Sequence, residues 1–388
     1  MPSAELERVL AEVATTPCLV VDADVVARRF ASLVAALPGV EIYYAVKANP
    51  AAELVQLLEA IGCGFDIASE GELELVTGIG ARGRRVSFGN TIKRATAIEA
   101  AASVGVTDFA VDAPDELAKV AAAAPGSVAV IRLLCDPPGA AWPLSGKFGC
   151  RADAAVELGR EAHRLGLGIG LSFHVGSQQR LPAAWASALA DAGGVIDRLA
   201  QHGVGVELLN LGGGFPGSYG DGAPSIEDYG ARILADLEAV LGARRPPRLA
   251  VEPGRYLVAD AGVLRTEVLL VSPPKCEGGP RWVYVDVGVF SGLVETIGEA
   301  IRYPVRVVPA PWREGGGAVG PAILAGPTCD SLDVLAEERP YDLPVDLREG
   351  DRIDLMSAGA YTASCSSVGF NGFPPLRQIV LGAPPAPN

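Results

Sequence analysis

The residue of this chain best suited to covalent chemistry is Lys47, which lies in the run Glu41-Ile-Tyr-Tyr-Ala-Val-Lys-Ala-Asn-Pro50. Residues 42–46 are apolar and partly β-branched, which is typical of a buried parallel strand. A lysine that ends such a strand is costly unless something neutralises it. The same desolvation would lower its pKa and allow the amine to condense with an aldehyde. Lys47 is therefore either a strand-end lysine that reaches solvent or a Schiff-base lysine.

Two further segments carry groups that suit a flat, phosphorylated molecule. Phe173-His-Val-Gly-Ser177 supplies an imidazole, His174, that could face a planar ring, and a hydroxyl, Ser177, that could bind phosphate. The alternative for His174 is a core histidine bonded to a backbone carbonyl. Leu211-Gly-Gly-Gly-Phe-Pro216 allows several N–H groups to converge on an anion, although a plain tight turn would also explain it.

The segment Val251-Glu-Pro-Gly-Arg-Tyr256 adds a second half to this constellation. Arg255 can bind phosphate, and Gly254 permits close approach of the backbone. Glu252 could accept a hydrogen bond from a protonated pyridine nitrogen and so keep a cofactor ring cationic. A lysine, a glycine-rich anion site and a carboxylate of this kind together predict pyridoxal 5'-phosphate.

Two motifs in the second half of the chain carry other reactive groups. Cys329 and Asp330 lie in the run Gly326-Pro-Thr-Cys-Asp-Ser-Leu-Asp333, which predicts a rigid turn. Cys329 is either part of a polar site there or a buried structural thiol. Gly359-Ala-Tyr-Thr362 and Gly369-Phe-Asn-Gly-Phe373 present the hydroxyl of Tyr361 and two phenylalanines.

Alternating strand and helix patterns position the first group of residues. Strand-like runs occur at 42–47, 63–68, 85–90, 108–112, 128–135, 169–175, 206–211 and 248–252. Helical patterns lie at 51–60, 70–79, 92–103, 115–123, 151–165, 183–201 and 226–241. Eight such repeats predict an α/β fold of the (β/α)₈ TIM-barrel type, in which chemistry sits at the carboxyl ends of the strands. A doubly wound sheet is the alternative, but the sequence has no Gly-x-Gly-x-x-Gly motif after the first strand.

The pattern changes after about residue 256. Short strand-like runs follow at 263–271, 282–287, 305–308, 322–325, 352–355 and 377–381, which predicts an all-β domain. We expect the strand-like run 17–22 to join it. The predicted domains are therefore a cofactor-binding barrel at 30–255 and a β domain formed by 1–29 and 256–388.

Composition limits the classes of partner. The formal net charge of −14 and the lack of a basic cluster argue against nucleic-acid binding. No apolar run is long enough to span a bilayer, so no membrane association is expected. The seven cysteines form no CxxC pair and indicate a reducing, cytoplasmic setting, and the three histidines make a multi-histidine metal site improbable.

The motifs YYAVKANP, FDIASEGE, FHVGSQ, LGGGFPG, EPGRYLV, GPTCDSLD and GAYT with GFNGF resemble the fold-type III pyridoxal-phosphate decarboxylases. That family acts on ornithine, lysine, diaminopimelate and related amino acids, shares its barrel with alanine racemase, and includes enzymes of polyamine biosynthesis. The resemblance covers residues 17–376. It implies decarboxylation of a basic L-amino acid to the amine.

The resemblance also implies roles for individual residues. Lys47 would carry the cofactor as a Schiff base, Glu252 would pair with the ring nitrogen, and His174 would stack on the ring. Asp66 and Glu72 match polar residues that flank the lysine. The phosphate would be held by Ser177, Gly213, Gly214, Gly254, Arg255 and Tyr361. The family's site lies at a head-to-tail homodimer interface, so Cys329 and Asp330 would act on the partner's cofactor, with Cys329 returning a proton to Cα.

The residues that would read the substrate follow from the same resemblance. In ornithine decarboxylases an aspartate for the distal amine lies in the region of Asp286–Glu299, and Glu299 aligns with it, with Gly298 in place of a tyrosine. Glu295 is one helical turn away and is the alternative, and Phe370 would line the pocket. Because glutamate is one methylene longer than aspartate, we expect a substrate of ornithine size to be preferred over lysine.

Three other functions compete with this prediction. An alanine-racemase-like enzyme needs a second base, typically a tyrosine, where the resemblance places Cys329. A decarboxylase of a modified or carrier-linked amino acid would need no distal carboxylate. A non-catalytic binder, such as a regulatory homologue, should have lost some of the cofactor-binding groups, all of which are present here.

Overall fold

The computed structural model describes residues 3–142, 146–220, 222–310 and 317–382. The chain divides into two compact units. One consists of residues 27–216 and 223–257 and contains the barrel strands. The other is formed by residues 3–26, 217–222 and 258–382 and contains the mostly antiparallel sheet.

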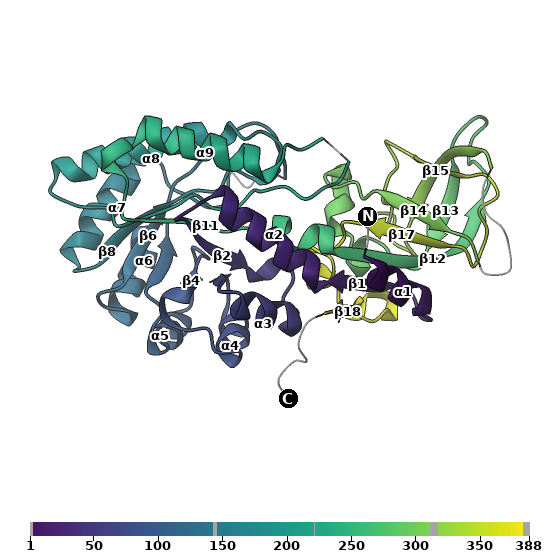
Figure 1. Cartoon of the computed structure of the whole chain (residues 1–388), viewed down its shortest axis with the longest axis horizontal. Helices are drawn as coiled ribbons and strands as arrows, with labels where there is room; N and C mark the ends of the chain where they lie inside the picture. The colour runs from purple at the N-terminus through teal and green to yellow at the C-terminus, as the bar shows by residue number, and fades with distance from the viewer. Residues whose placement is uncertain (1–2, 143–145, 221, 311–316, 383–388) are drawn as a thin grey trace. The chain divides into compact units, whose positions relative to one another are not determined.

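The first unit is built on a closed barrel of parallel strands, which confirms the predicted (β/α)₈ fold (Figure 1). The barrel closes where β11 pairs with β2, with Val251 opposite Ile42. Its strands, in chain order, are β2 (Glu41–Ala45), β3 (Gly64–Ile67), β4 (Val86–Phe88), β5 (Asp108–Val111), β6 (Val128–Arg132), β8 (Gly168–Ser172), β10 (Leu208–Asn210) and β11 (Arg248–Val251). Every strand-like run predicted for the barrel thus overlaps an observed strand.

Helices cover the outside of the barrel (Figure 1). They are α2 (Ala23–Ala36), α3 (Ala52–Ala60), α4 (Glu70–Gly78), α5 (Ala95–Ser103), α6 (Pro114–Ala123), α7 (Ala152–Arg164), α8 (Ala184–Gln201) and α9 (Ile226–Val240), with a short α10 (Arg255–Val258) after the last strand. Local chemistry sets their starts, since Ser69 caps α4 and Ser225 forms a capping box with Asp228 at α9. A two-stranded ribbon that the sequence did not reveal, β7 (Ala140–Trp142) with β9 (Ser177–Gln179), follows the barrel strands β6 and β8.

The second unit is an eight-stranded, mostly antiparallel sheet. Its strands are β1 (Cys18–Asp22), β12 (Gly262–Ser272), β13 (Arg281–Val285), β14 (Val305–Val308), β15 (Val319–Ala325), β16 (Tyr341–Pro344), β17 (Arg352–Met356) and β18 (Arg377–Leu381). Strand β16 was not predicted, because its Tyr-Asp-Leu-Pro run is short and ends in proline. In the structure it pairs with β15 as an outer strand of the sheet.

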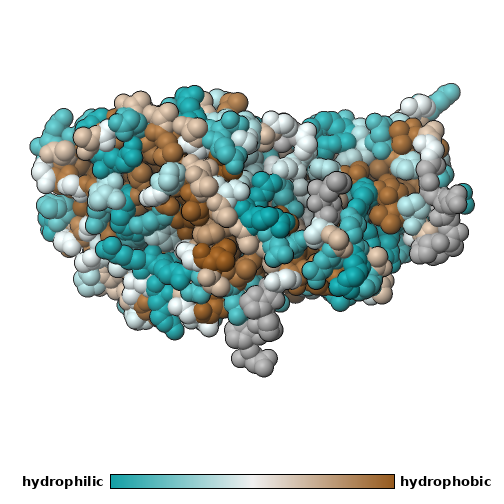
Figure 2. Space-filling model, in the orientation of Figure 1, coloured by the Kyte–Doolittle hydropathy of each residue, from teal (hydrophilic) through white to brown (hydrophobic). Residues whose placement is uncertain are grey.

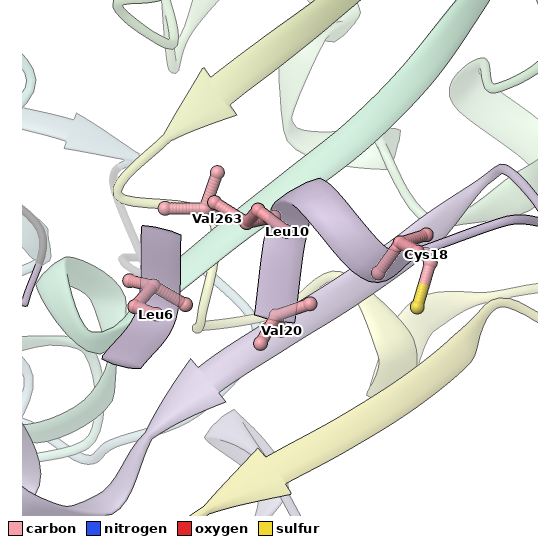
Figure 3. Packing of buried hydrophobic residues seen from close by; sticks show 6 residues of the cluster. Leu6, Leu10, Cys18, Val20 and Val263 are labelled. Carbon is pink, nitrogen blue, oxygen red and sulfur yellow. The ribbon is translucent and has the colours of Figure 1, made fainter. Parts of the chain in front are cut away.

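The amino-terminal strand β1 belongs to this sheet, between β12 and β18. The helix α1 (Ala4–Glu12) covers it, and Figure 3 shows Leu6 and Leu10 of the helix packed with Val20 and Val263. All four side chains are buried. Burial of these apolar groups stabilises the pairing of the amino-terminal strand with strands from the carboxyl-terminal part of the chain.

The surface is of mixed polarity. Figure 2 shows hydrophilic residues spread over much of one face, with smaller hydrophobic areas between them. Among the described residues, no helix combines the length and apolarity needed to cross a bilayer.

Candidate active site

Lys47 follows the end of the first barrel strand. The strand β2 ends at Ala45, and Lys47 lies in the 3₁₀ turn η1 (Val46–Ala48) with its side chain 53% exposed. The expectation of a desolvated lysine on the strand itself is therefore wrong, because the chain turns before the lysine is reached. Its Nζ instead lies 3.3 Å from Oδ2 of the buried Asp66, at the mouth of the barrel.

Asp66 belongs to the next strand, β3, and is paired in register with Ala45. Burial raises the pKa of this carboxyl group, and the charge of Lys47 opposes that shift. Gly89, just after β4, leaves room for it, since a Cβ there would lie 2.1 Å from Oδ1. Glu72, predicted to flank the lysine, accepts a hydrogen bond from the Ala68 amide at 2.7 Å, and burial raises its pKa.

Glu252 follows the last barrel strand and lies close enough to Asp66 for the two charges to interact. The pKa of Glu252 is raised to about 7, mainly by burial and to a smaller extent by the charge of Asp66. Asn210, the last residue of β10, donates from Nδ2 to Oε1 of Glu252 at 2.5 Å. A carboxylate in this environment is best satisfied by a cationic donor. The sequence analysis did not identify Asn210, and its place directly before the glycine-rich loop was the only available signal.

His174 lies after β8 with its ring partly buried. The Gly176 amide donates to Nδ1 at 3.0 Å, so Nδ1 is an acceptor and the ring proton resides on Nε2. Burial, together with the charges of Arg132 and Lys47, lowers the pKa of His174 to about 3. The imidazole is therefore neutral at physiological pH, and its Nδ1 does not donate to a backbone carbonyl.

The glycine-rich loop lies against this histidine. Gly212 and Gly214 have φ values of 68° and 112°, which favour glycine. A Cβ on Gly213 would lie 2.7 Å from the Glu252 carbonyl oxygen and 2.9 Å from Nε2 of His174. The backbone at Gly213 thus forms a cradle, a space that any larger side chain at this position would fill.

A cation lies beside a hydroxyl in the same unit. Arg255, at the start of α10 and buried, approaches Oγ of Ser177 through Nη2 at 3.0 Å and Nε at 3.3 Å. Gly254 directly precedes it and is buried. A guanidinium and a hydroxyl held together in this way can both bind a phosphate.

These groups fit pyridoxal phosphate. The amine of Lys47 suits the aldehyde, the carboxylate of Glu252 suits a protonated ring nitrogen, and the neutral imidazole of His174 suits a planar ring. The space beside Gly213 would be lost to any larger residue, and Arg255 with Ser177 suits the phosphate.

The other predicted site residues belong to the β-sheet unit. Cys329 is exposed and its Sγ accepts a hydrogen bond from Nδ2 of Asn371 at 3.2 Å. Asp330 is half-buried and caps the backbone amide of Leu332. The buried Asp333, which the sequence analysis quoted without a role, holds this turn by accepting from the amides of Val289 and Thr328.

The two carboxylates expected to bind the distal amine of the substrate, Glu299 and Glu295, differ in their surroundings. The carboxylate of Glu299 accepts from the amides of Glu338 and Arg339 and forms an ion pair of 2.7 Å with Nε of Arg339. The expectation that Glu299 faces a pocket is thus not supported, because Arg339, 40 positions later in the chain, forms an ion pair with its carboxylate. Glu295 is buried, with 9% of its surface exposed.

The aromatic residues of the carboxyl-terminal motifs are also in this unit. Phe370 stacks on Phe290, with ring centroids 4.2 Å apart. Tyr361 is half-buried and has a φ of 55°, so its backbone adopts a conformation that is rare outside glycine.

Comparison with known proteins agrees with this geometry. Residues 23–259 match the family model described as pyridoxal-dependent decarboxylase, pyridoxal binding domain. Lysine/ornithine decarboxylase of Selenomonas ruminantium is 33% identical, over 94% of this chain and 90% of that protein. Antizyme inhibitor 2 of Xenopus laevis is 33% identical, over 95% of this chain and 82% of that protein.

A solved structure extends the similarity to the whole fold. The lysine/ornithine decarboxylase from Vibrio vulnificus complexed with cadaverine superposes with a TM-score of 0.86 at 32% identity, covering 98% of this chain and 100% of that one. The chain therefore belongs to the family of pyridoxal-dependent decarboxylases.

Proposed function

We propose that this chain removes the α-carboxylate of a basic L-amino acid, ornithine or lysine in type, and releases the corresponding amine, with pyridoxal phosphate as its cofactor. The observation that carries the proposal is the cluster of Lys47, Asp66 and Glu252 at one end of the barrel, beside the cradle at Gly213. Relatives and structural neighbours named as lysine/ornithine decarboxylases support the substrate class.

The bound cofactor supplies an electron sink for the pair of electrons left when carbon dioxide departs. Glu252 would accept a hydrogen bond from the protonated ring nitrogen through its carboxylate, which would keep that sink cationic. Asp66 holds a counter-charge at Nζ of Lys47 while that amine is free. His174 offers a neutral ring face and adds no charge that would compete with the ring cation.

The phosphate end is proposed to be bound by groups of three kinds. Amides of Gly213, Gly214 and Gly254 supply fixed dipoles, Arg255 supplies charge, and the hydroxyls of Ser177 and Tyr361 complete the set. Binding at this end would hold the cofactor independently of Lys47.

The enzyme is proposed to be a homodimer in which the partner subunit's Cys329 and Asp330 complete each site. The exposed thiol, held by Asn371 in a turn fixed by Asp333, is suited to deliver a proton to Cα after decarboxylation. A thiol in that position distinguishes the reaction from racemisation, in which a second base must also remove a proton.

Mixing two inactive variants tests this arrangement. Lys47→Ala and Cys329→Ala homodimers should each be severely impaired. After subunit exchange, heterodimers carry both lesions in one site and leave the other intact, so activity should recover to about a quarter of wild type for random exchange. Exchange demonstrated by mass spectrometry without recovery would place Cys329 in its own subunit's site or outside the chemistry.

The distal amine of the substrate is proposed to be read by a carboxylate in η6 (Val294–Glu299), with Phe370 against the apolar part of the substrate. At Glu299 the substrate amine would have to compete with Arg339, which already pairs with that carboxylate, and the buried Glu295 is the alternative. Removing one partner of a charge-assisted pair costs ~2–3 kcal/mol, which corresponds to a change of roughly 30- to 150-fold.

Glu295→Gln should therefore raise KM for L-ornithine by roughly 30- to 150-fold and leave kcat nearly unchanged, because the contact is remote from Cα. Glu299→Gln should have a smaller effect, since its amide oxygen can still accept from the two backbone N–H groups. Steady-state kinetics with both variants provide the measurement. Unchanged KM in both would contradict a distal-cation pocket.

The Glu299–Arg339 ion pair favours a second candidate, decarboxylation of a modified or carrier-linked amino acid that has no free distal cation. Assays of carbon dioxide release with L- and D-ornithine, L- and D-lysine, and citrulline- or carrier-linked analogues separate the two. We expect L-ornithine to give the highest kcat/KM. Racemisation without amine formation would instead indicate the alanine-racemase-like activity, and no turnover of any substrate would support a regulatory role.

We further propose a cytoplasmic enzyme of polyamine biosynthesis. Free cysteines in the described part of the chain agree with a reducing compartment. Structural neighbours named as lysine/ornithine decarboxylases are complexed with the diamines cadaverine and putrescine, which supports this proposal.

A further inference from the structure

A closed ring of three hydrogen bonds joins the glycine-rich loop to Glu252. The Glu252 amide donates to the Gly212 carbonyl at 2.9 Å, and the Gly212 amide donates to Oδ1 of Asn210 at 2.9 Å. Nδ2 of Asn210 then donates to Oε1 of Glu252 at 2.5 Å. The ring thus links the end of β10, the start of the loop and the residue after β11.

This ring fixes the orientation of the Asn210 amide. A backbone N–H can only donate, so the atom of Asn210 that faces Gly212 must be its oxygen. The NH₂ group therefore faces Glu252 and favours the carboxylate as acceptor. Asn210 is 3% exposed, so water offers the amide little alternative.

We propose that Asn210 is a positioning residue that keeps Glu252 ionised and turned so that its second carboxylate oxygen remains available to the ring nitrogen of pyridoxal phosphate. This inference rests on the role of Glu252 in the proposed function. It adds a residue that touches neither cofactor nor substrate and acts through Glu252.

The chemistry of an amide suits this position. Burial and the neighbouring Asp66 both disfavour the charged form of Glu252, so the carboxylate needs a donor. A lysine or arginine in place of Asn210 would supply one, but its full charge would compete with the ring cation for Glu252. A neutral N–H donor stabilises the carboxylate and leaves that pairing intact.

The test uses the enzyme loaded with pyridoxal phosphate labelled with ¹⁵N in the ring, because the ¹⁵N chemical shift reports directly whether the ring nitrogen carries a proton. In the wild type we expect the shift of a protonated ring. Asn210→Leu replaces the amide with an apolar side chain of similar volume, and Asn210→Ala removes it. In both variants we expect the shift to move toward that of an unprotonated ring. Either variant suffices if the other does not fold.

Asn210→Asp separates an electrostatic role from a structural one. Its carboxylate can still accept from the Gly212 amide, but it cannot donate to Glu252, and its charge disfavours the ionised form of Glu252, so the shift should move toward that of an unprotonated ring. If Asn210 acted only as a structural bridge to Gly212, this variant would keep that bridge and its shift should equal that of the wild type. Asn90→Ala is the matched control, because Asn90 follows a barrel strand but donates to the backbone carbonyl of Ala68. Its ¹⁵N shift should equal that of the wild type.

The outcomes distinguish this inference from the proposed function. An unprotonated ring in the wild type would overturn the role of Glu252 and the inference with it. A protonated ring in the wild type and an unchanged shift in Asn210→Leu or Asn210→Ala would overturn the role of Asn210 alone. A wild-type shift in Asn210→Asp would likewise overturn the electrostatic role and leave the proposed function standing.

Discussion

Lys47→Ala should lower kcat by roughly 10⁴- to 10⁶-fold, the scale seen when an essential catalytic group is removed. The amine is the only group at the mouth that we assign to covalent attachment of the cofactor, and alanine provides no replacement. The half-exposed side chain contributes little packing, so circular dichroism should show a retained fold. Carbon dioxide release from carboxyl-labelled ornithine measures the loss.

Lys275→Ala is the control for this prediction. Lys275 is exposed and lies over the ring of Trp282 in the β-sheet unit, so the variant should retain wild-type kcat. Near wild-type turnover in Lys47→Ala would show that another group performs the covalent step.

Glu252→Gln should retain bound cofactor but lose roughly 10²- to 10³-fold in kcat, the cost expected when one charge-stabilising contact is removed. A neutral amide cannot balance a ring cation, so the electron sink weakens while the phosphate contacts persist. KM should change little, since the lost contact matters most in the transition state. Stopped-flow kinetics and the bound-cofactor content provide the measurements.

Glu41→Gln is the matched control, because Glu41 lies at the opposite end of the neighbouring strand, where it pairs with Arg248. It should leave kcat near the wild-type value. An unaffected kcat in Glu252→Gln would mean that another group maintains the ring proton.

The fold was predictable because each barrel repeat carries a local signal. Apolar runs mark the strands, and caps such as Ser69 and Ser225 mark helix starts, so the order of elements follows from neighbouring residues. The positions of Asp66, His174 and Glu252 then follow from the rule that parallel strands bring their carboxyl ends together. These local rules require no knowledge of distant contacts.

The remaining features depend on contacts that local patterns do not contain. Lys47 is half-exposed because the backbone turns at Val46, which the apolar run conceals. The pairing of Glu299 with Arg339 joins residues 40 positions apart. The role inferred for Asn210 requires the direction of an amide, which only the Gly212 amide reveals.

The central claim is that Lys47 holds pyridoxal phosphate at the mouth of this barrel, and reduction with borohydride tests it most directly. Reduction fixes the link between cofactor and lysine, so peptide mass spectrometry can locate it. We predict one phosphopyridoxyl-modified peptide, containing Lys47, with loss of decarboxylase activity in proportion to its yield. Modification confined to another lysine, such as the buried Lys93, or inactivation without modification of Lys47, would contradict the account.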